Sequence, residues 1–177
     1  MTLPVDYRAF LLAADADGAG PGYGLFPLVR DAAGAWTWRA LDIAETDLAR
    51  LAQAFDPTPV LAGLARLRAD PPPAGAGAGS HEYEAWWDAW QEVLEDPRST
   101  TGAVGLCHEG CGYLYWLVVS GPHRGEIWFD GRAADDPVRP LRDEAGQPVG
   151  FAAWYLRWLV EAEATGGTGR AGGRAGL

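Results

Sequence analysis

The segment YLYWLVV, residues 113–119, decides the fold of this chain together with EIWFD at residues 126–130. Both segments are rich in aromatic and β-branched residues, which favour strands. The length and composition of residues 113–119 suit a strand that is buried on both faces. The connection GPHRG, residues 121–125, has turn-forming glycine and proline. An apolar run at residues 103–107 precedes the first segment, and residues 108–112 between them are expected to form a turn. Because such short connections suit neighbouring antiparallel strands, we expect a central β-meander.

Apolar residues at helical spacing predict five helices around this meander. The first is expected at residues 5–14, and the second begins at Thr46. A third helix ends at Ala69, a fourth follows the N-cap Ser80, and a fifth follows Gly150. The helix from Thr46 would bury Leu48, Leu51, Ala52 and Phe55. The closing helix would pack on the sheet through Phe151, Trp154, Tyr155, Trp158 and Leu159.

Short strands are expected at residues 25–29 and 35–41, with an edge strand at residues 138–141. The pattern predicts an α+β fold, with an antiparallel or mixed β-sheet flanked by helices. We expect one domain over residues 1–164, in which residues 70–80 (DPPPAGAGAGS) form an internal linker. The Gly-rich residues 165–177 are expected to be a disordered tail.

The composition argues against several classes of protein. Twenty-four acidic residues face 14 arginines and no lysine, so the net charge of the 177-residue chain is −10. Since an acidic surface repels phosphate, we expect no nucleic-acid binding. The sequence has no membrane-length apolar run and no signal-peptide pattern, and its two cysteines cannot form a disulfide scaffold. We therefore expect a cytoplasmic protein without membrane contact.

The segment Cys107-His108-Glu109-Gly110-Cys111 contains residue types that bind zinc. A structural zinc site needs four ligands, usually as two close pairs, and this chain has no second pair. The spacing favours two structural cysteines at strand ends, and the alternative is a Cys–His nucleophile of a small hydrolase. We expect no catalytic residue, no metal and no cofactor. Most of the nine tryptophans are expected to pack in the core.

Three blocks of sequence together carry a family pattern. The first block is Leu3-Pro4-x-Asp6-Tyr7 with Gly20-Pro21-Gly22-Tyr23-Gly24-Leu25-Phe26-Pro27-Leu28. The second is Gly110-Cys111-Gly112 with Leu117-Val118-Val119 and Ile127-Trp128-x-Asp130. The third is Phe151-x-x-Trp154 with Trp158-Leu159. This pattern resembles the SMI1/KNR4 domains of the SUKH superfamily over residues 3–30 and 102–163. The resemblance implies an α+β fold without catalytic activity. It also implies an immunity protein that neutralises a toxin by binding it, or alternatively a general protein-interaction scaffold.

The tryptophan-rich helix after Ser80 is the predicted partner-binding surface, because it lies outside the blocks that define the fold. Its polar side carries Glu84, Asp88, Glu92 and Glu95, with Glu82 and Asp96 at its ends. A basic toxin, such as a nuclease, would meet this side with complementary charge. Trp87 or Trp90 could add an aromatic anchor. The alternative is that the acidic residues only keep the helix in solution.

Overall fold

The main sheet is an antiparallel meander. The computed structural model describes residues 2–14, 18–39 and 46–166, and within them the chain forms four α-helices and two sheets. The main sheet contains, in this order, β3 (Ala103–Gly110), β4 (Tyr113–Val118), β5 (Ile127–Asp130) and β6 (Arg139–Pro140). All its neighbouring strands are antiparallel, which confirms the predicted meander, its edge strand and the α+β class.

The β3–β4 hairpin is tighter than we expected. Residues 108–110, assigned to a turn from the sequence, continue β3, and Gly110 pairs with Tyr113. The chain reverses at Cys111 and Gly112, whose φ angles are 53° and 81°. Two-residue hairpin turns favour such positive φ angles, so two residues are enough to reverse the chain.

A smaller sheet pairs β1 (Leu28–Arg30) with β2 (Trp36–Trp38). Both strands were predicted but are shorter than expected, and residues 40–41 lie outside the described part of the chain. Just before β1, the backbone N–H of Phe26 donates to the carbonyl of Leu106 at 2.7 Å. This segment therefore covers part of the free edge of β3, which would otherwise expose unpaired backbone groups.

The four helices are α1 (Val5–Ala13), α2 (Thr58–Ala69), α3 (His81–Leu94) and α4 (Phe151–Ala164). The hydroxyl of Ser80 accepts a hydrogen bond from the backbone N–H of Tyr83, which confirms the predicted cap of α3. The carboxylate of Asp6 in α1 accepts from the N–H of Ala152 at 3.0 Å, so α1 caps the first turn of α4. Residues 167–177 of the predicted tail lie outside the described residues.

The predicted helix from Thr46 is wrong, because residues 48–52 form turns and residue 53 lies in a bend. Leu51 and Phe55 are buried as expected, but their backbone bonds to the sheet connection instead of to a helix. The N–H of Phe55 donates to the carbonyl of Ser120 at 3.1 Å, and the hydroxyl of Ser120 donates to the carbonyl of Leu51 at 2.5 Å. These tertiary hydrogen bonds replace the helical ones, so tertiary context overrides the local periodicity.

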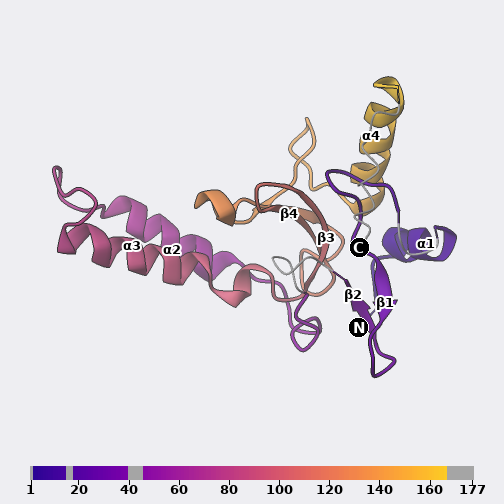
Figure 1. Ribbon diagram of the computed structural model, residues 1–177, viewed down its shortest axis with the longest axis horizontal. Helices are drawn as coiled ribbons and strands as arrows, with labels where there is room; N and C mark the ends of the chain where they lie inside the picture. The colour runs from indigo at the N-terminus through magenta and orange to yellow at the C-terminus, as the bar shows by residue number, and fades with distance from the viewer. Residues whose placement is uncertain (1, 15–17, 40–45, 167–177) are drawn as a thin grey trace, which may run out of the picture.

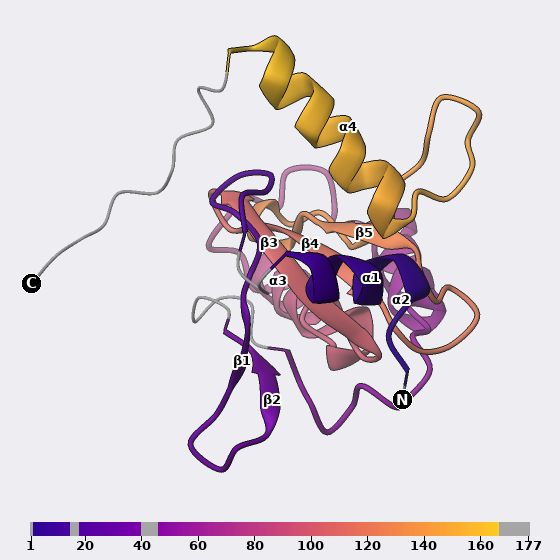
Figure 2. The ribbon, with the colours of Figure 1, turned by 90° about the vertical axis from the view of Figure 1, so that its right-hand side faces the viewer.

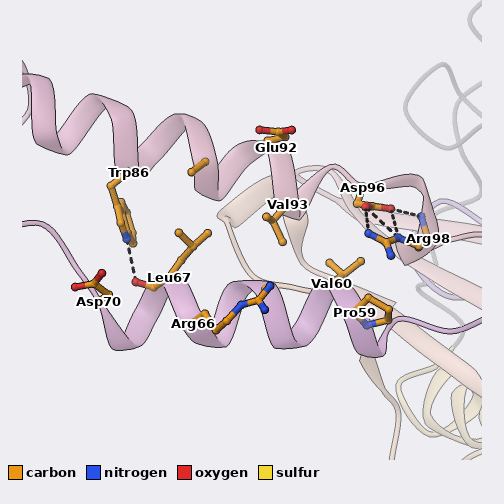
Figure 3. A pocket seen from close by; sticks show the side chains of 12 residues that line it. Pro59, Val60, Arg66, Leu67, Asp70, Trp86, Glu92, Val93, Asp96 and Arg98 are labelled. Atoms are coloured by element: carbon orange, nitrogen blue, oxygen red, sulfur yellow. Dashed lines mark hydrogen bonds and ion pairs between the residues drawn. The ribbon is translucent and has the colours of Figure 1, made fainter.

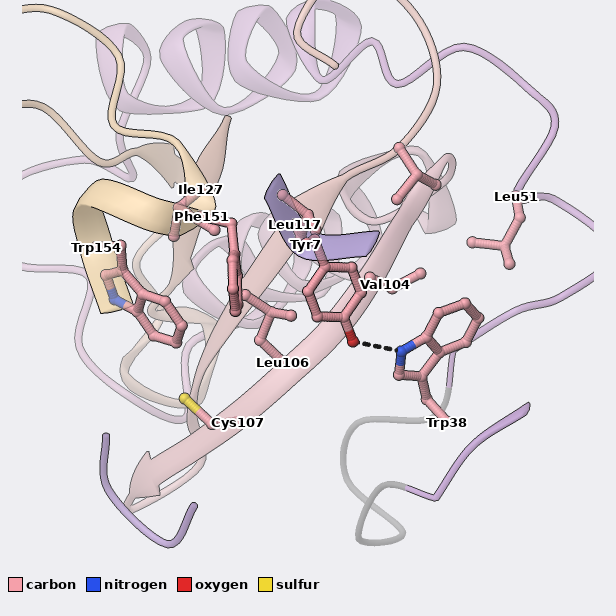
Figure 4. Packing of buried hydrophobic residues seen from close by; sticks show 11 residues of the cluster. Tyr7, Trp38, Leu51, Val104, Leu106, Cys107, Leu117, Ile127, Phe151 and Trp154 are labelled. Atoms are coloured by element: carbon pink, nitrogen blue, oxygen red, sulfur yellow. Dashed lines mark hydrogen bonds between the residues drawn. The ribbon is translucent and has the colours of Figure 1, made fainter. Parts of the chain in front are cut away.

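One face of the sheet packs against α1 and α4, which both lie on this side (Figure 2). Trp154 and Phe151 are buried here, and the rings of Trp154 and Tyr115 lie 5.3 Å apart, which confirms that the closing helix packs on the sheet. Figure 4 shows Tyr7 within this cluster, where its hydroxyl accepts a hydrogen bond from the indole N–H of Trp38 at 2.8 Å.

The other face of the sheet holds a second cluster. Alternate residues of β4, Leu114, Trp116 and Val118, point to this cluster and pack with Phe55 and Trp128. The sheet is thus buried on both faces, as its apolar strands predicted. Eight of the nine tryptophans are buried or half-buried, while Trp36 is 53% exposed.

Candidate functional site

The helices α2 and α3 form a hairpin that projects from the side of the sheet opposite α1 and α4 (Figures 1 and 2). We call residues 58–94 the arm. Residues 70–80, predicted to be a linker, are the loop at the tip that connects two helices packed on each other. The indole N–H of Trp86 closes this tip by donating to the carbonyl of Leu67 at 2.9 Å.

The arm has a hydrophobic core of its own, separate from the two clusters on the sheet. Val60 and Leu64 of α2 pack against Trp90 and Leu94 of α3, and all four side chains are at least 96% buried. The helices approach closely at Gly63, where an added Cβ atom would lie 2.8 Å from Cγ1 of Val93. The contact between α2 and α3 therefore requires glycine at this position.

Three of the predicted binding carboxylates form an exposed row on α3. Glu84, Asp88 and Glu92 are spaced four residues apart, so they lie on one side of the helix. Within the described residues none of these three side chains takes part in a hydrogen bond or an ion pair. We call these residues the acidic stripe. Their charges are available to a partner, because no arginine of the described structure neutralises them.

The other predicted carboxylates are occupied within the protein. Glu95 lies 3.5 Å from the guanidinium of Arg132, and Asp96 pairs with Arg98 at 2.6 Å. The hydrogen bonds from Arg98 hold the pKa of Asp96 below its usual value, although partial burial opposes this effect. Glu82 is exposed in the first turn of α3. The predicted acidic surface thus has two parts. The acidic stripe has no ion pair in the described residues, whereas Glu95 and Asp96, at the C-terminal end of α3, pair with arginines.

The two predicted aromatic anchors differ in exposure. Trp90 is only 4% exposed and stacks on Trp86, so its proposed role as an anchor is wrong, because its ring belongs to the core of the arm. Trp87 is half-buried and keeps part of its ring at the surface. Trp86, which we did not single out from the sequence, is also half-buried and lines a groove.

This groove runs between α2 and α3 and has a volume of about 600 Å³ (Figure 3). Apolar atoms of Leu67, Trp86, Ala89 and Val93 line its middle. Charged side chains stand around them, and these are Arg66, Asp70, Glu92, Asp96 and Arg98. Sequence periodicity could not reveal the groove, because its existence depends on how the two helices pair.

A buried charge network fixes the base of the arm to the sheet. The guanidinium of Arg132 donates to the carboxylate of Asp130 at 2.8 Å and also approaches Glu95. Burial alone would lower the pKa of Arg132, but the hydrogen bond to Asp130 and the two negative charges raise it. Beside this network, the amide of Gln91 donates to Asp135 at 2.9 Å. Arg68 of α2 also lies 3.9 Å from Asp136, so the segment after β5 holds the arm both at its base and along one side.

The two cysteines lie in different environments, and Cys107 lies within β3 and not at its end as we expected. Cys107 is fully buried, and desolvation together with the charge of Glu109 raises the pKa of its thiol. Cys111 is exposed on the hairpin turn, and the imidazole Nε2 of His108 accepts a hydrogen bond from the N–H of Gly112 at 3.0 Å. A thiol that stays protonated is a poor nucleophile. In residues 2–14, 18–39 and 46–166, no three His, Cys, Asp or Glu side chains gather as metal ligands would.

Comparison with known proteins yields no relative, since no family model, curated protein or solved structure matches the chain. The resemblance to the SMI1/KNR4 family therefore stays a prediction that rests on the residues that carry it. In the described part of the chain, none of the helices has both the length and the apolar character needed to cross a bilayer.

Proposed function

We propose that this chain is a non-enzymatic protein-binding domain of SMI1/KNR4 type, which neutralises a toxin by direct binding. The observation that carries the proposal is the acidic stripe on the projecting arm, with no neutralising arginine in the described structure. Glu84, Asp88 and Glu92 form a row of like charges on a projecting helix, without ion-pair partners in the described residues. Such a row attracts a basic surface, and this supports a role toward another molecule.

The stripe suits a basic partner. Its carboxylates repeat at about 6 Å along the helix axis, since each residue rises by about 1.5 Å. A single exposed ion pair contributes only about 0–1 kcal/mol, so the stripe would act mainly by steering a basic surface and speeding its association. A nuclease must attract phosphate and therefore presents such a surface. A toxin that acts inside the cell must be met there, so the proposal includes a cytoplasmic location.

Trp87 and Trp86 complete the proposed interface. Interfaces combine charged rims with aromatic anchors, which bury a large area and lose little conformational entropy on binding. Both indole rings are half-buried on α3, close to the stripe along the sequence. The same arrangement would also serve a general interaction scaffold, and only the nature of the partner separates these two functions.

The proposal is tested by capture followed by co-expression. The purified chain is immobilised, proteins retained from an extract of its own cells are identified by mass spectrometry, and each candidate is then expressed with and without the chain. We expect a basic protein that arrests growth alone and is tolerated with the chain. A partner that is harmless alone would overturn the toxin assignment and leave the scaffold function.

Charge reversal then tests the surface. Asp88→Arg with Glu92→Arg should slow association with the captured partner several-fold at low salt, as measured by surface plasmon resonance. The matched control, Glu161→Arg with Glu163→Arg on the exposed side of α4, changes the net charge equally and should leave the rate unaltered. If both pairs slow association equally, only the overall charge matters and the stripe is not the binding surface.

A further inference from the structure

We infer that the groove between α2 and α3 receives an amphipathic α-helix of the partner, which would complete a three-helix cluster on the arm. This inference rests on the proposed function, because it names the partner element that the arm recognises. The groove lies beside the acidic stripe, and Glu92 belongs to both (Figure 3). A basic surface that the acidic stripe attracts therefore lies next to the groove.

The floor of the groove is apolar and has its small residue in the middle. Along α3, Ala89 follows Trp86 by three residues and precedes Val93 by four, and all three line the groove together with Leu67 of α2. These side chains are half-buried, so each keeps apolar surface that a partner could cover. A large residue of a partner helix can enter above the small side chain of Ala89, as ridges pack into grooves between helices.

The α3 lip is acidic, whereas the α2 lip carries one cation, Arg66, and ends at the acidic Asp70. Glu92 stands on the α3 lip, with Asp88 and Glu84 further along the same helix. Arg66 stands on the α2 lip and has no ion pair within the described residues. At the base end Asp96 and Arg98 neutralise each other, with their nearest atoms 2.6 Å apart.

This pattern specifies the occupant. A complementary helix has an apolar stripe at positions i, i+3 or i+4, and i+7, lysine or arginine on the side over α3, and an acidic residue on the side over Arg66. Asp70 marks the tip end of the α2 lip. Residues 59–70 line the groove on the α2 side and residues 86–93 line it on α3, so a partner helix of about 8–12 residues, or about 12–18 Å, matches its length.

A helix fits this groove better than an extended peptide. An extended peptide gains affinity mainly from main-chain hydrogen bonds to an open strand edge. The walls here are the interiors of two helices, whose backbone N–H and C=O groups bond within each helix. Side-chain packing is then the available mode of recognition, and it favours an occupant that presents its side chains on one face.

The test uses a synthetic probe and the full chain. The probe is a fluorescein-labelled 18-residue peptide with leucine at helical spacing, lysine on one flank, glutamate on the other and alanine elsewhere. Its control is a peptide of identical composition with the order scrambled. Fluorescence anisotropy should detect saturable binding of the patterned peptide and at least about tenfold weaker binding of the scrambled one. Equal binding of both peptides would overturn the inference.

Two variants locate the binding. Ala89→Trp fills the middle of the groove and should weaken patterned-peptide binding at least about tenfold. The matched control Ala65→Trp lies on the exposed outer side of α2 and should bind like the wild type. Circular dichroism verifies that both variants keep their helices. Wild-type binding by Ala89→Trp, or equal loss in the two variants, would overturn the inference.

A charge exchange gives a second, independent test that does not depend on filling the groove. Arg66→Glu should weaken binding of the patterned peptide several-fold, and replacing the glutamate flank of the peptide by lysine should restore it. No recovery with the lysine-flanked peptide would contradict the proposed orientation and with it the inference. Failure of the groove tests leaves the proposed function standing if reversal of the stripe still slows association with the captured partner.

Discussion

Arg132 connects the arm to the main sheet, and Arg132→Met tests this connection. Its guanidinium donates to Asp130 at 2.9 Å and 2.8 Å and lies 3.5 Å from Glu95. Because Asp130 is only 2% exposed, removal of Arg132 leaves a buried carboxylate without a countercharge. Breaking a buried pair in this way costs about 3–5 kcal/mol. The indole N–H of Trp116 still donates to Asp130 at 2.9 Å, so we expect the lower end, about 3 kcal/mol.

Urea denaturation followed by tryptophan fluorescence and by far-ultraviolet circular dichroism measures this loss. The control Arg157→Met breaks an exposed pair with Glu161 and should cost less than about 0.5 kcal/mol. The double variant Asp130→Asn/Arg132→Met removes both charges but keeps an acceptor for Trp116, and it should regain at least about 1 kcal/mol relative to Arg132→Met. A cost similar to that of the control, or no recovery in the double variant, would refute this role of Arg132.

Three further predictions concern the buried face of the sheet and the two thiols. Trp154→Ala should lower the free energy of unfolding by about 3–5 kcal/mol and give molten or insoluble protein, whereas an unchanged melting temperature would contradict its place in the core. Burial raises the pKa of Tyr7 to about 12, although the hydrogen bond from Trp38 lowers it. The protein should therefore lose about 2–3 kcal/mol of its free energy of unfolding as the pH rises from 10 to 12, whereas this stability is fully present below pH 10. Alkaline unfolding curves of Tyr7→Phe should lack this loss. Ellman's reagent should modify Cys111 rapidly in the native protein and Cys107 only after denaturation, and rapid reaction of both would show that β3 opens easily.

The elements that could be predicted from the sequence are those whose signals are local. The meander follows from apolar strands separated by short turns, and the start of α3 follows from the hydroxyl of Ser80. The start of the closing helix packs as expected through Phe151 and Trp154. Trp158 and Leu159, which were expected to pack on the sheet as well, are only half-buried and lie outside the core cluster. In each case the residues that determine the structure are neighbours along the chain, so periodicity and capping are sufficient.

The pairing of α2 with α3 could not be predicted, because it depends on contacts between residues distant in sequence. Gly63 permits the close approach to Val93, yet in the sequence it resembles any other glycine in a helix. The same holds for the tryptophans of α3. Trp87 and Trp90 share one apolar side of the helix, and only the position of α2 decides that Trp90 is enclosed while Trp87 keeps exposed surface.

The helix predicted from Thr46 does not form, for a different reason. The apolar spacing of the segment suits a helix, but Gly102, just before β3, lies very close to it. A Cβ atom at Gly102 would lie 2.3 Å from the carbonyl oxygen of Gln53. The hydroxyl of Thr46 itself accepts a hydrogen bond from the N–H of Gly105 at 3.1 Å. Leu51 and Phe55 therefore reach the core from a turn-rich segment, whereas Leu48 and Ala52, which were also expected to be buried, are exposed.

The separation of the arm from the sheet has a consequence for binding. Glu84, Asp88 and Glu92 are exposed and, in the described structure, unpaired, so substitutions there should change stability by no more than about 0.5 kcal/mol. Glu95 differs, because it pairs with Arg132 at the base. The charge pattern of the stripe can therefore change to suit a different partner without affecting the core, provided that the network at the base is kept. Recognition and folding are then carried by different residues of the same helix, and α3 connects them.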